Sequence, residues 1–222
     1  MKENTRDYVY RTLKNKIMYL ELLPGENVSE IELAEQLGVS RTPIREVMVK
    51  LVSENLVEVY PQRGSFVSKI DLEAVDEGYA LRKLVEKDVL KRAMDKMDVE
   101  QFKELQKNLY LQKGNIELGE SVIDRFQLDN EFHKIIYRIA SRKRTWEGLQ
   151  TICTHYDCLR FLDAMDIEGS GKTTLKQHTL ILDALEKREF EKIDEIIDQH
   201  LSNFKEKIEK FKTEYPDYFK EN

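Results

Sequence analysis

The chain has 222 residues, of which 41% are hydrophobic and 35% are charged, and its formal net charge at pH 7 is −6. This composition excludes a disordered chain, and no apolar run approaches the roughly 20 residues that a membrane-spanning helix needs. The first 16 residues are polar and charged, unlike the apolar stretch of a signal peptide. We therefore expect a cytoplasmic protein with no membrane contact, in which Cys153 and Cys158 stay reduced and buried.

The excess negative charge lies entirely after residue 70. Residues 1–70 hold ten basic and ten acidic residues, whereas residues 71–222 hold 26 basic and 32 acidic residues. A neutral first part beside an acidic second part is compatible with DNA binding at the N-terminal end, because the local placement of charge matters more than the total.

The pattern of the first 55 residues predicts three helices. Residues 5–20 have apolar residues at helical spacing, and a Leu-Pro-Gly sequence ends that segment. A short second helix begins at Ser29, which forms a capping box with Glu32, and it ends at Gly38. Ser40 is the expected N-cap of the third helix. Two short helices joined by a tight glycine turn are typical of a helix-turn-helix.

The next segment reads as a β-hairpin. Residues 56–60 and 65–68 are expected strands, and residues 61–64 are their turn. A hairpin directly after a helix-turn-helix is a wing. Residues 1–70 are therefore predicted to be a winged helix-turn-helix DNA-binding domain.

From Asp71 onward only helical patterns occur, and Asp98 with Gln101 forms a further capping box. The expected helices span roughly 72–96, 98–113, 120–140, 142–164, 173–187 and 189–212. Residues 71–222 are therefore predicted to be an all-α antiparallel helical bundle that binds an effector and dimerises. The whole chain is expected to be mainly α.

The start of the third helix carries the side chains that DNA recognition needs. Arg41 and Arg45 lie on one helical face, and each can make a bidentate contact to a guanine edge. Ser40 and Thr42 are short donors suited to phosphates, and Arg63 lies at the tip of the wing. The alternative is that both arginines are solvated surface residues paired with neighbouring glutamates.

The residues that carry this pattern resemble the GntR family of winged-helix regulators. They are LPGE at 23–26, SEIELAEQLGVSRTPIREV at 29–47 and GSFV at 64–67. The similarity covers residues 6–70. It implies that Arg41, Thr42 and Arg45, together with Arg63 and Gly64 on the wing, contact operator DNA.

Three of the four histidines can meet inside the bundle. Asp129 and His133 are one turn apart on one helix, while His178 and His200 belong to two later helices. Imidazole with carboxylate suits zinc, nickel, iron or manganese. The alternative is that these histidines are hydrogen-bonded core residues. His155 has no partner at useful spacing and is expected to be structural.

A second resemblance concerns this cluster. LRKLVE at 81–86, DNEFH at 129–133, HTLILDAL at 178–185 and HL at 200–201 are similar to the FCD ligand-binding domain over about residues 72–210. The resemblance implies a divalent transition metal, zinc foremost, held by Asp129, His133, His178 and His200. It also implies that Arg82 clamps an effector carboxylate. The alternative is that Arg82 forms a surface salt bridge, for instance with Glu86 four residues later.

We therefore expect a homodimeric repressor that reads double-stranded operator DNA and responds to a small organic acid at the metal. The helix over 72–96, with Tyr79, Leu84 and Leu90, is expected to supply part of the dimer face. One alternative is the same regulator with a metal-free bundle that binds an acyl or apolar ligand. Another is a metal-dependent enzyme that carries a helix-turn-helix. The GSGKTT segment at 169–174 lacks the first glycine and the preceding strand of a phosphate-binding loop, so we expect a mobile turn there, followed by a threonine that caps the next helix.

Overall fold

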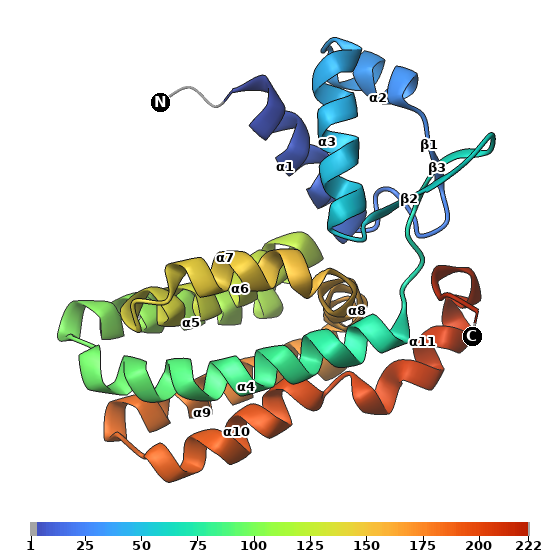
Figure 1. The fold of residues 1–222 in the computed structure, drawn as a ribbon. Coiled ribbons are helices and arrows are strands. Elements are labelled where there is room, and N and C mark those ends of the chain that lie inside the picture. The colour runs from blue at the N-terminus through green and yellow to red at the C-terminus, as the bar shows by residue number, and fades with distance from the viewer. Residues whose placement is uncertain (1–3, 222) are drawn as a thin grey trace.

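A computed structural model describes residues 4–221, and their elements form a winged N-terminal region above a helical region (Figure 1). The winged region contains α1 (Thr5–Met18), β1 (Asn27–Val28), α2 (Glu30–Leu37), α3 (Arg41–Ser53), β2 (Val57–Tyr60) and β3 (Gly64–Val67). The helical region contains α4 (Leu72–Lys96), α5 (Val99–Leu118), α6 (Val122–Ile139), α7 (Lys143–Ile152), α8 (Thr154–Ala164), α9 (Lys172–Lys187), α10 (Phe190–Ser202) and α11 (Ile208–Glu214). The predicted fold class, mainly α with a winged helix-turn-helix and a helical bundle, is confirmed.

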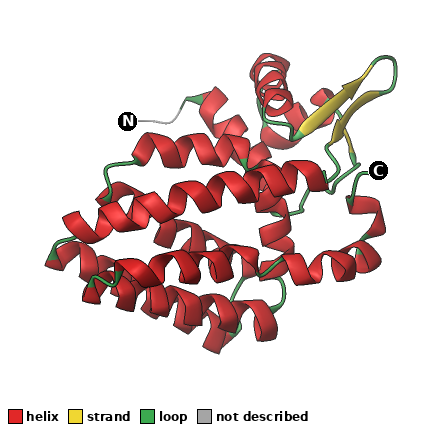
Figure 2. Cartoon of the chain, turned by 60° about the horizontal axis from the view of Figure 1, so that its bottom comes forward, coloured by secondary structure: helices red, strands yellow, loops and turns green. Residues whose placement is uncertain are grey.

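The winged region forms where local signals place it. Ser29 accepts a hydrogen bond from the backbone N–H of Glu32 (3.4 Å) at the start of α2, and Gly38 ends that helix in a left-handed conformation. The sheet has the strand order β1-β3-β2, all antiparallel, and its first strand was not predicted. The β2–β3 hairpin projects past the helices, which makes it a wing (Figure 2).

The helical region is built around α4. This helix packs against α6, α7 and α8 on one side and against α9 and α10 on the other (Figure 1). Helix α5 packs against α6 and α9. The capping box predicted for Asp98 and Gln101 is present at the start of α5.

Three expected helix bounds are wrong. The helix from 98 does not stop near 113 but continues to Leu118, where Gly119 takes the left-handed conformation that ends it. The segment 142–164 is two helices, α7 and α8, which meet at Cys153. The segment 189–212 is also interrupted, because α10 ends at Ser202 and a 3-10 turn over Lys205–Lys207 precedes α11.

Two further expectations need correction. Tyr79 and Leu90 are buried in the core of their own chain, so of the expected dimer-face residues only Leu84 is exposed, at 73%. The GSGKTT segment contains the end of a π-helical turn, Ile167–Gly171, and α9 then begins at Lys172 with no threonine cap. Helix α8, and no strand, precedes this turn.

The two regions are connected by α8 and by the end of the chain. At the junction, the backbone N–H of Ile70 donates to the carbonyl of Tyr218 (2.7 Å), and the N–H of Lys220 donates to the carbonyl of Ile70 (3.0 Å). Asp71 caps α4, and its own N–H donates to Nδ1 of His155 (3.2 Å). His155 therefore has a structural contact at the junction.

Candidate functional site

The exposed start of α3 presents the two arginines that the sequence analysis selected. Their side chains are 50% and 63% exposed, for Arg41 and Arg45 respectively. Both point to Glu30 on α2: its Oε2 lies 2.9 Å from Nε of Arg45 and 3.8 Å from an Nη of Arg41. The carboxylate of Glu30 therefore holds both arginine side chains on the same surface. Exposed pairs of this kind are weak, so DNA phosphates and bases can compete for the arginines.

The neighbouring donors are also accessible. The side chain of Ser40 makes no capping hydrogen bond although Ser40 is the N-cap of α3, and Thr42 is exposed. Arg63 lies in the exposed turn of the wing, with its guanidinium 5.7 Å from the centre of the Tyr60 ring. Gly64 has φ +107°, and a Cβ there would lie 3.0 Å from Nδ2 of Asn27. The backbone of the wing therefore requires glycine at this position.

A second group of candidate residues lies inside the helical region. Asp129 and His133 come from α6, His178 from α9 and His200 from α10. One possible ligand atom from each of these residues lies within 4.8 Å of the others. The three histidines are buried, with at most 8% of any of them exposed. The packing of the helices thus brings together the four residues that the sequence analysis proposed.

Each imidazole has its outer nitrogen held by an acceptor. In His133, Nδ1 lies 3.1 Å from a carboxylate oxygen that belongs to Glu86. Nδ1 of His178 lies 2.9 Å from the amide oxygen of Gln112. Nδ1 of His200 lies 3.1 Å from the amide oxygen of Gln177. An acceptor at Nδ1 fixes the proton on Nδ1 and leaves Nε2 as a lone pair. All three Nε2 atoms are therefore available to the centre of the cluster.

The inner nitrogens themselves lack suitable hydrogen-bond partners. Nε2 of His133 and Nε2 of His200 lie 3.1 Å apart, and two lone pairs that face each other need a proton or a cation between them. Nε2 of His178 is buried and has no hydrogen-bond partner. Three inward lone pairs with one carboxylate are the donor set of a divalent transition metal. The residues present therefore fit the metal that the sequence analysis expects.

The electrostatics of the cluster keep it in the form that binds a cation. Burial lowers the pKa of His178 and lowers that of His200 to about 3, so both rings are neutral at pH 7. Burial opposes ionisation of Asp129 too, but Arg160 and the histidines outweigh it and hold the pKa of this carboxyl below its ordinary value. Asp129 is thus an anion beside the neutral imidazoles of His178 and His200.

Several residues of this site were missed by the sequence analysis. Arg160 on α8 pairs with Asp129 and with Asp157 (2.6 Å), and Gln112 comes from α5. No motif in the sequence marks either of them, because their contacts cross between helices. Glu86 was noted only for its spacing from Arg82, although it also orients His133.

A cavity of about 60 Å³, partly open to solvent, adjoins the cluster. Asp129, His200, Arg160 and Arg125 are in its walls, whereas Arg82 is not. Arg82 is 2% exposed and donates from Nε to Glu86, and its two terminal nitrogens have no hydrogen-bond partner. Its expected contact with an effector stays a prediction.

Helix α8 joins this cavity to the winged region. Tyr156 and Arg160 line the cavity from one face of α8. At the start of the same helix, the Thr154 hydroxyl donates to the carbonyl of Glu54 (3.0 Å), which is the C-cap residue of α3. One helix therefore contacts both the cavity and the end of the helix that carries Arg41 and Arg45.

Comparison with known proteins agrees with this arrangement. Residues 77–203 match the FCD domain, and residues 5–67 match the family described as bacterial regulatory proteins, gntR family. The chain belongs to the GntR family. Its helical region is an FCD domain, and GntR-family proteins with this domain are DNA-binding transcription regulators, not enzymes.

Relatives of this GntR-family chain cover nearly its whole length. The HTH-type transcriptional repressor RspR of Escherichia coli strain K12 is 32% identical over 96% of this chain and 92% of its own. An HTH-type regulator of Streptomyces ambofaciens is 33% identical over 97% and 89%. Among solved structures, E. coli McbR/YncC has a TM-score of 0.78 at 23% identity, covering 92% and 99%, which concerns the fold alone. Within residues 4–221, no helix combines the length and apolarity that crossing a membrane requires.

Proposed function

We propose that this GntR-family regulator is a homodimeric repressor that senses a small organic acid at a divalent metal, zinc foremost. The observation that carries the proposal is the orientation of three buried imidazoles. Each has its Nδ1 held by an acceptor and its Nε2 directed at a common centre beside Asp129. Histidines that serve only as polar core need no such common orientation.

The metal would be held by Asp129, His133, His178 and His200. When bound, a divalent ion supplies a fixed positive charge at the end of the adjoining cavity, which attracts a carboxylate. The chain's own residues do the rest: Arg160 keeps Asp129 ionised and oriented, and the cavity walls enclose the acid. Arg82 as a direct clamp on the acid belongs to this proposal as well, through its two terminal nitrogens, which make no hydrogen bond, although one of them lies 3.9 Å from the Asp157 carboxylate.

The DNA-reading part of the proposal rests on the start of α3 and on the wing. Ser40 and Thr42 would bind phosphates, Arg41 and Arg45 would bind base edges, and the wing would contribute Arg63 and Gly64. Two copies related by two-fold symmetry would read the halves of a near-palindromic operator. The repressor assignment draws on RspR, the relative named as a repressor.

Communication between the two parts would run through α8. An acid in the cavity contacts the face of α8 that holds Arg160, and the start of that helix is bonded to the end of α3. Such an acid can change DNA affinity only if it binds two arrangements of the winged region with different affinity.

The direct test is the metal content of untagged protein purified without chelators, for the wild type and for His178→Ala. We expect about one divalent ion per chain, lost in the variant. His155→Ala is the matched control, because His155 is a buried histidine outside the cluster. Wild-type protein that stays metal-free even after reconstitution would overturn the metal-sensing half and favour an apolar ligand, while DNA binding would stand.

A further inference from the structure

Arg125 is a buried cation in the wall of the same cavity. It comes from α6, one turn before Asp129, and only 6% of it is exposed. Its Nε donates to the side-chain oxygen of Asn115 (3.3 Å) and one terminal nitrogen donates to the carbonyl of Ala164 (2.6 Å). Both partners are neutral. The structure therefore fixes the position of this guanidinium without neutralising its charge.

The second terminal nitrogen of Arg125 has no partner. It is buried, and no ion pair joins Arg125 to a carboxylate anywhere in the described part of the chain. Burial accordingly lowers the pKa of this guanidinium from its ordinary value. Buried charges in proteins are normally paired, because desolvating a lone charge is costly. An anion in the cavity would supply the missing partner.

The other charges of the cavity walls are already matched. Asp129 is paired with Arg160, and Asp163 is paired with Lys207 (2.7 Å) from outside the wall. Among the described residues, Arg125 is therefore the charged side chain of the wall that has no oppositely charged partner. A divalent metal at the four-residue cluster would add a second cationic centre beside the same cavity. A ligand that meets both centres would carry two acidic groups.

We infer that the effector is a compact dianion, with one carboxylate at the metal and a second acidic group at Arg125. This inference rests on the proposed function. Arg125 and Asp129 are four residues apart on one helix, so their backbones are separated by about 6 Å along its axis. That spacing suits a short dicarboxylic acid or a small phosphorylated carboxylic acid, since both place two acidic groups a few bonds apart.

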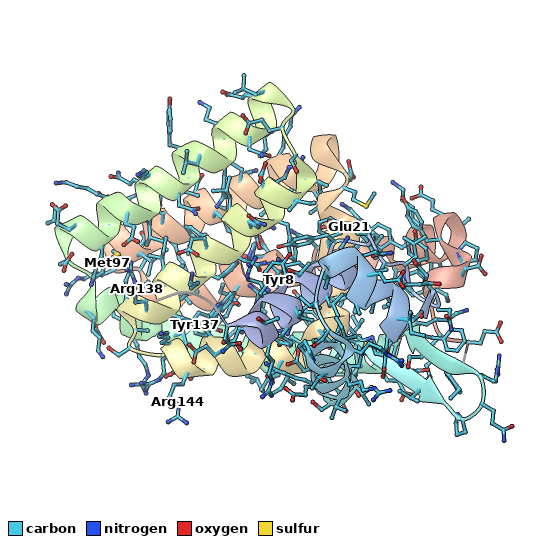
Figure 3. The ribbon with its side chains drawn as sticks, turned by 90° about the horizontal axis from the view of Figure 1, so that it is seen from above. Tyr8, Glu21, Met97, Tyr137, Arg138 and Arg144 are labelled. Carbon is cyan, nitrogen blue, oxygen red and sulfur yellow. The ribbon has the colours of Figure 1, made fainter. Side chains whose placement is uncertain are left out.

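Matched ligand pairs test this inference. Succinate and butyrate share a four-carbon chain and differ in one carboxylate, and 2-phosphoglycolate and glycolate differ in one phosphate. Their dissociation constants would be measured by calorimetry on zinc-loaded protein, for the wild type and for Arg125→Gln and Arg125→Lys. Arg144→Gln is the control, because Arg144 projects into solvent on the outside of α7 (Figure 3).

We expect at least one dianion to bind the wild type roughly 10- to 100-fold more tightly than its monoanionic partner, the range for a hydrogen bond to a charged group. Arg125→Gln should remove that preference without changing zinc content or the affinity for the monoanion. Arg125→Lys should keep part of the preference, because it keeps the positive charge. This variant also tests the inference if Arg125→Gln fails to fold. The ligand pair that shows the larger preference tells whether the second acidic group of the effector is a carboxylate or a phosphate.

Three results would overturn the inference. The dianions could bind no better than their partners, the preference could survive in Arg125→Gln, or no acid could bind protein that holds zinc. The last result would leave the metal site itself intact. A failure of the proposed function is distinguishable, because wild-type protein would then hold no zinc, and the inference would fail with it.

Discussion

Nε2 of His133 lies 3.1 Å from Nε2 of His200, yet the outer nitrogens of the two rings have different partners. His133 faces the carboxylate of Glu86, whereas His200 faces the neutral amide of Gln177. A carboxylate at this position makes the imidazole a stronger donor to a metal. We therefore expect His133 to be a stronger metal ligand than His200.

Gln177→Glu should raise metal affinity for this reason. A carboxylate beside Nδ1 of His200 would strengthen the ring as a ligand, and we expect zinc affinity to rise by about tenfold, the low end of effects from such partners. Competition with a chromogenic chelator measures it. Gln199→Glu adds the same charge on an exposed position of α10 and should leave affinity unchanged. Equal gains in both variants would show a general charge effect and contradict the role of Gln177.

Arg45→Ala should weaken and relax DNA recognition. The operator is first obtained by selecting duplexes from a random pool with the wild-type protein. Loss of a bidentate base contact should then reduce affinity for that operator by roughly 10- to 100-fold and broaden the preference at one base pair. Fluorescence anisotropy at fixed salt measures the change. Arg144→Ala removes an exposed arginine from α7 and should have no effect, and an unchanged preference in Arg45→Ala would remove this residue from the interface.

Glu30→Gln should have the opposite effect. Its carboxylate lies 2.9 Å from Nε of Arg45 and competes with DNA for that side chain. Removing an exposed ion pair of about 0.2 to 1 kcal/mol should strengthen operator binding by up to about fivefold, most clearly at low salt. Glu186→Gln, an exposed change on α9, is the control. Weaker binding of Glu30→Gln would mean that Glu30 orients the arginines for DNA and does not compete for them.

Local signals in the sequence predict those elements whose ends depend on local contacts. The bounds expected for the helix over 72–96 agree with α4 at both ends, where Asp71 caps it. The junction of α7 and α8 at Cys153 has a tertiary cause instead. There the backbone of Cys153 closely approaches Gly78 on α4, where an added Cβ would lie 3.4 Å from its Cα. No periodicity within 142–164 records that contact.

The same distinction applies to the candidate site. Asp129 and His133 share a helix face, so their proximity follows from spacing. His178 and His200 were proposed from their place on two later helices of a bundle, and the resemblance supported all four residues as ligands. Gln112 and Arg160 become visible only when α5 and α8 pack against the cluster. Among the described residues, the guanidinium of Arg125 has no carboxylate partner, and this too is a property of the folded cavity that no sequence pattern records.

Gly64→Ala should destabilise the wing. The position has φ +107°, and the new Cβ would lie 3.0 Å from Nδ2 of Asn27. We expect a loss of about 1 to 3 kcal/mol in the free energy of unfolding of the winged region. Urea unfolding followed by circular dichroism measures it. Gly114→Ala in α5 is the control, because nothing lies within 4 Å of its added Cβ, and it should stabilise by up to about 1 kcal/mol. Equal stability of Gly64→Ala and wild type would contradict the strain argument.

Thr154→Val should separate sensing from DNA binding. The change keeps the shape of a side chain that is 1% exposed and removes only its hydrogen bond to the carbonyl of Glu54 at the end of α3. Zinc content should stay the same, and operator affinity without acid should change by no more than about tenfold, since one such bond contributes about 0.5 to 1.5 kcal/mol. The change in operator affinity that an acid causes should shrink by about 0.5 to 2 kcal/mol, the range for residues that carry coupling between sites.

The measurement is operator affinity with and without the acid that alters wild-type binding most. Thr179→Val is the matched control, because that hydroxyl bonds only the carbonyl of Leu175 within α9. If Thr154→Val responds to the acid as the wild type does, the signal does not pass through the start of α8. A second route from the cavity to the winged region runs through Phe126, which lines the cavity and whose ring contacts that of Tyr19, near the end of α1.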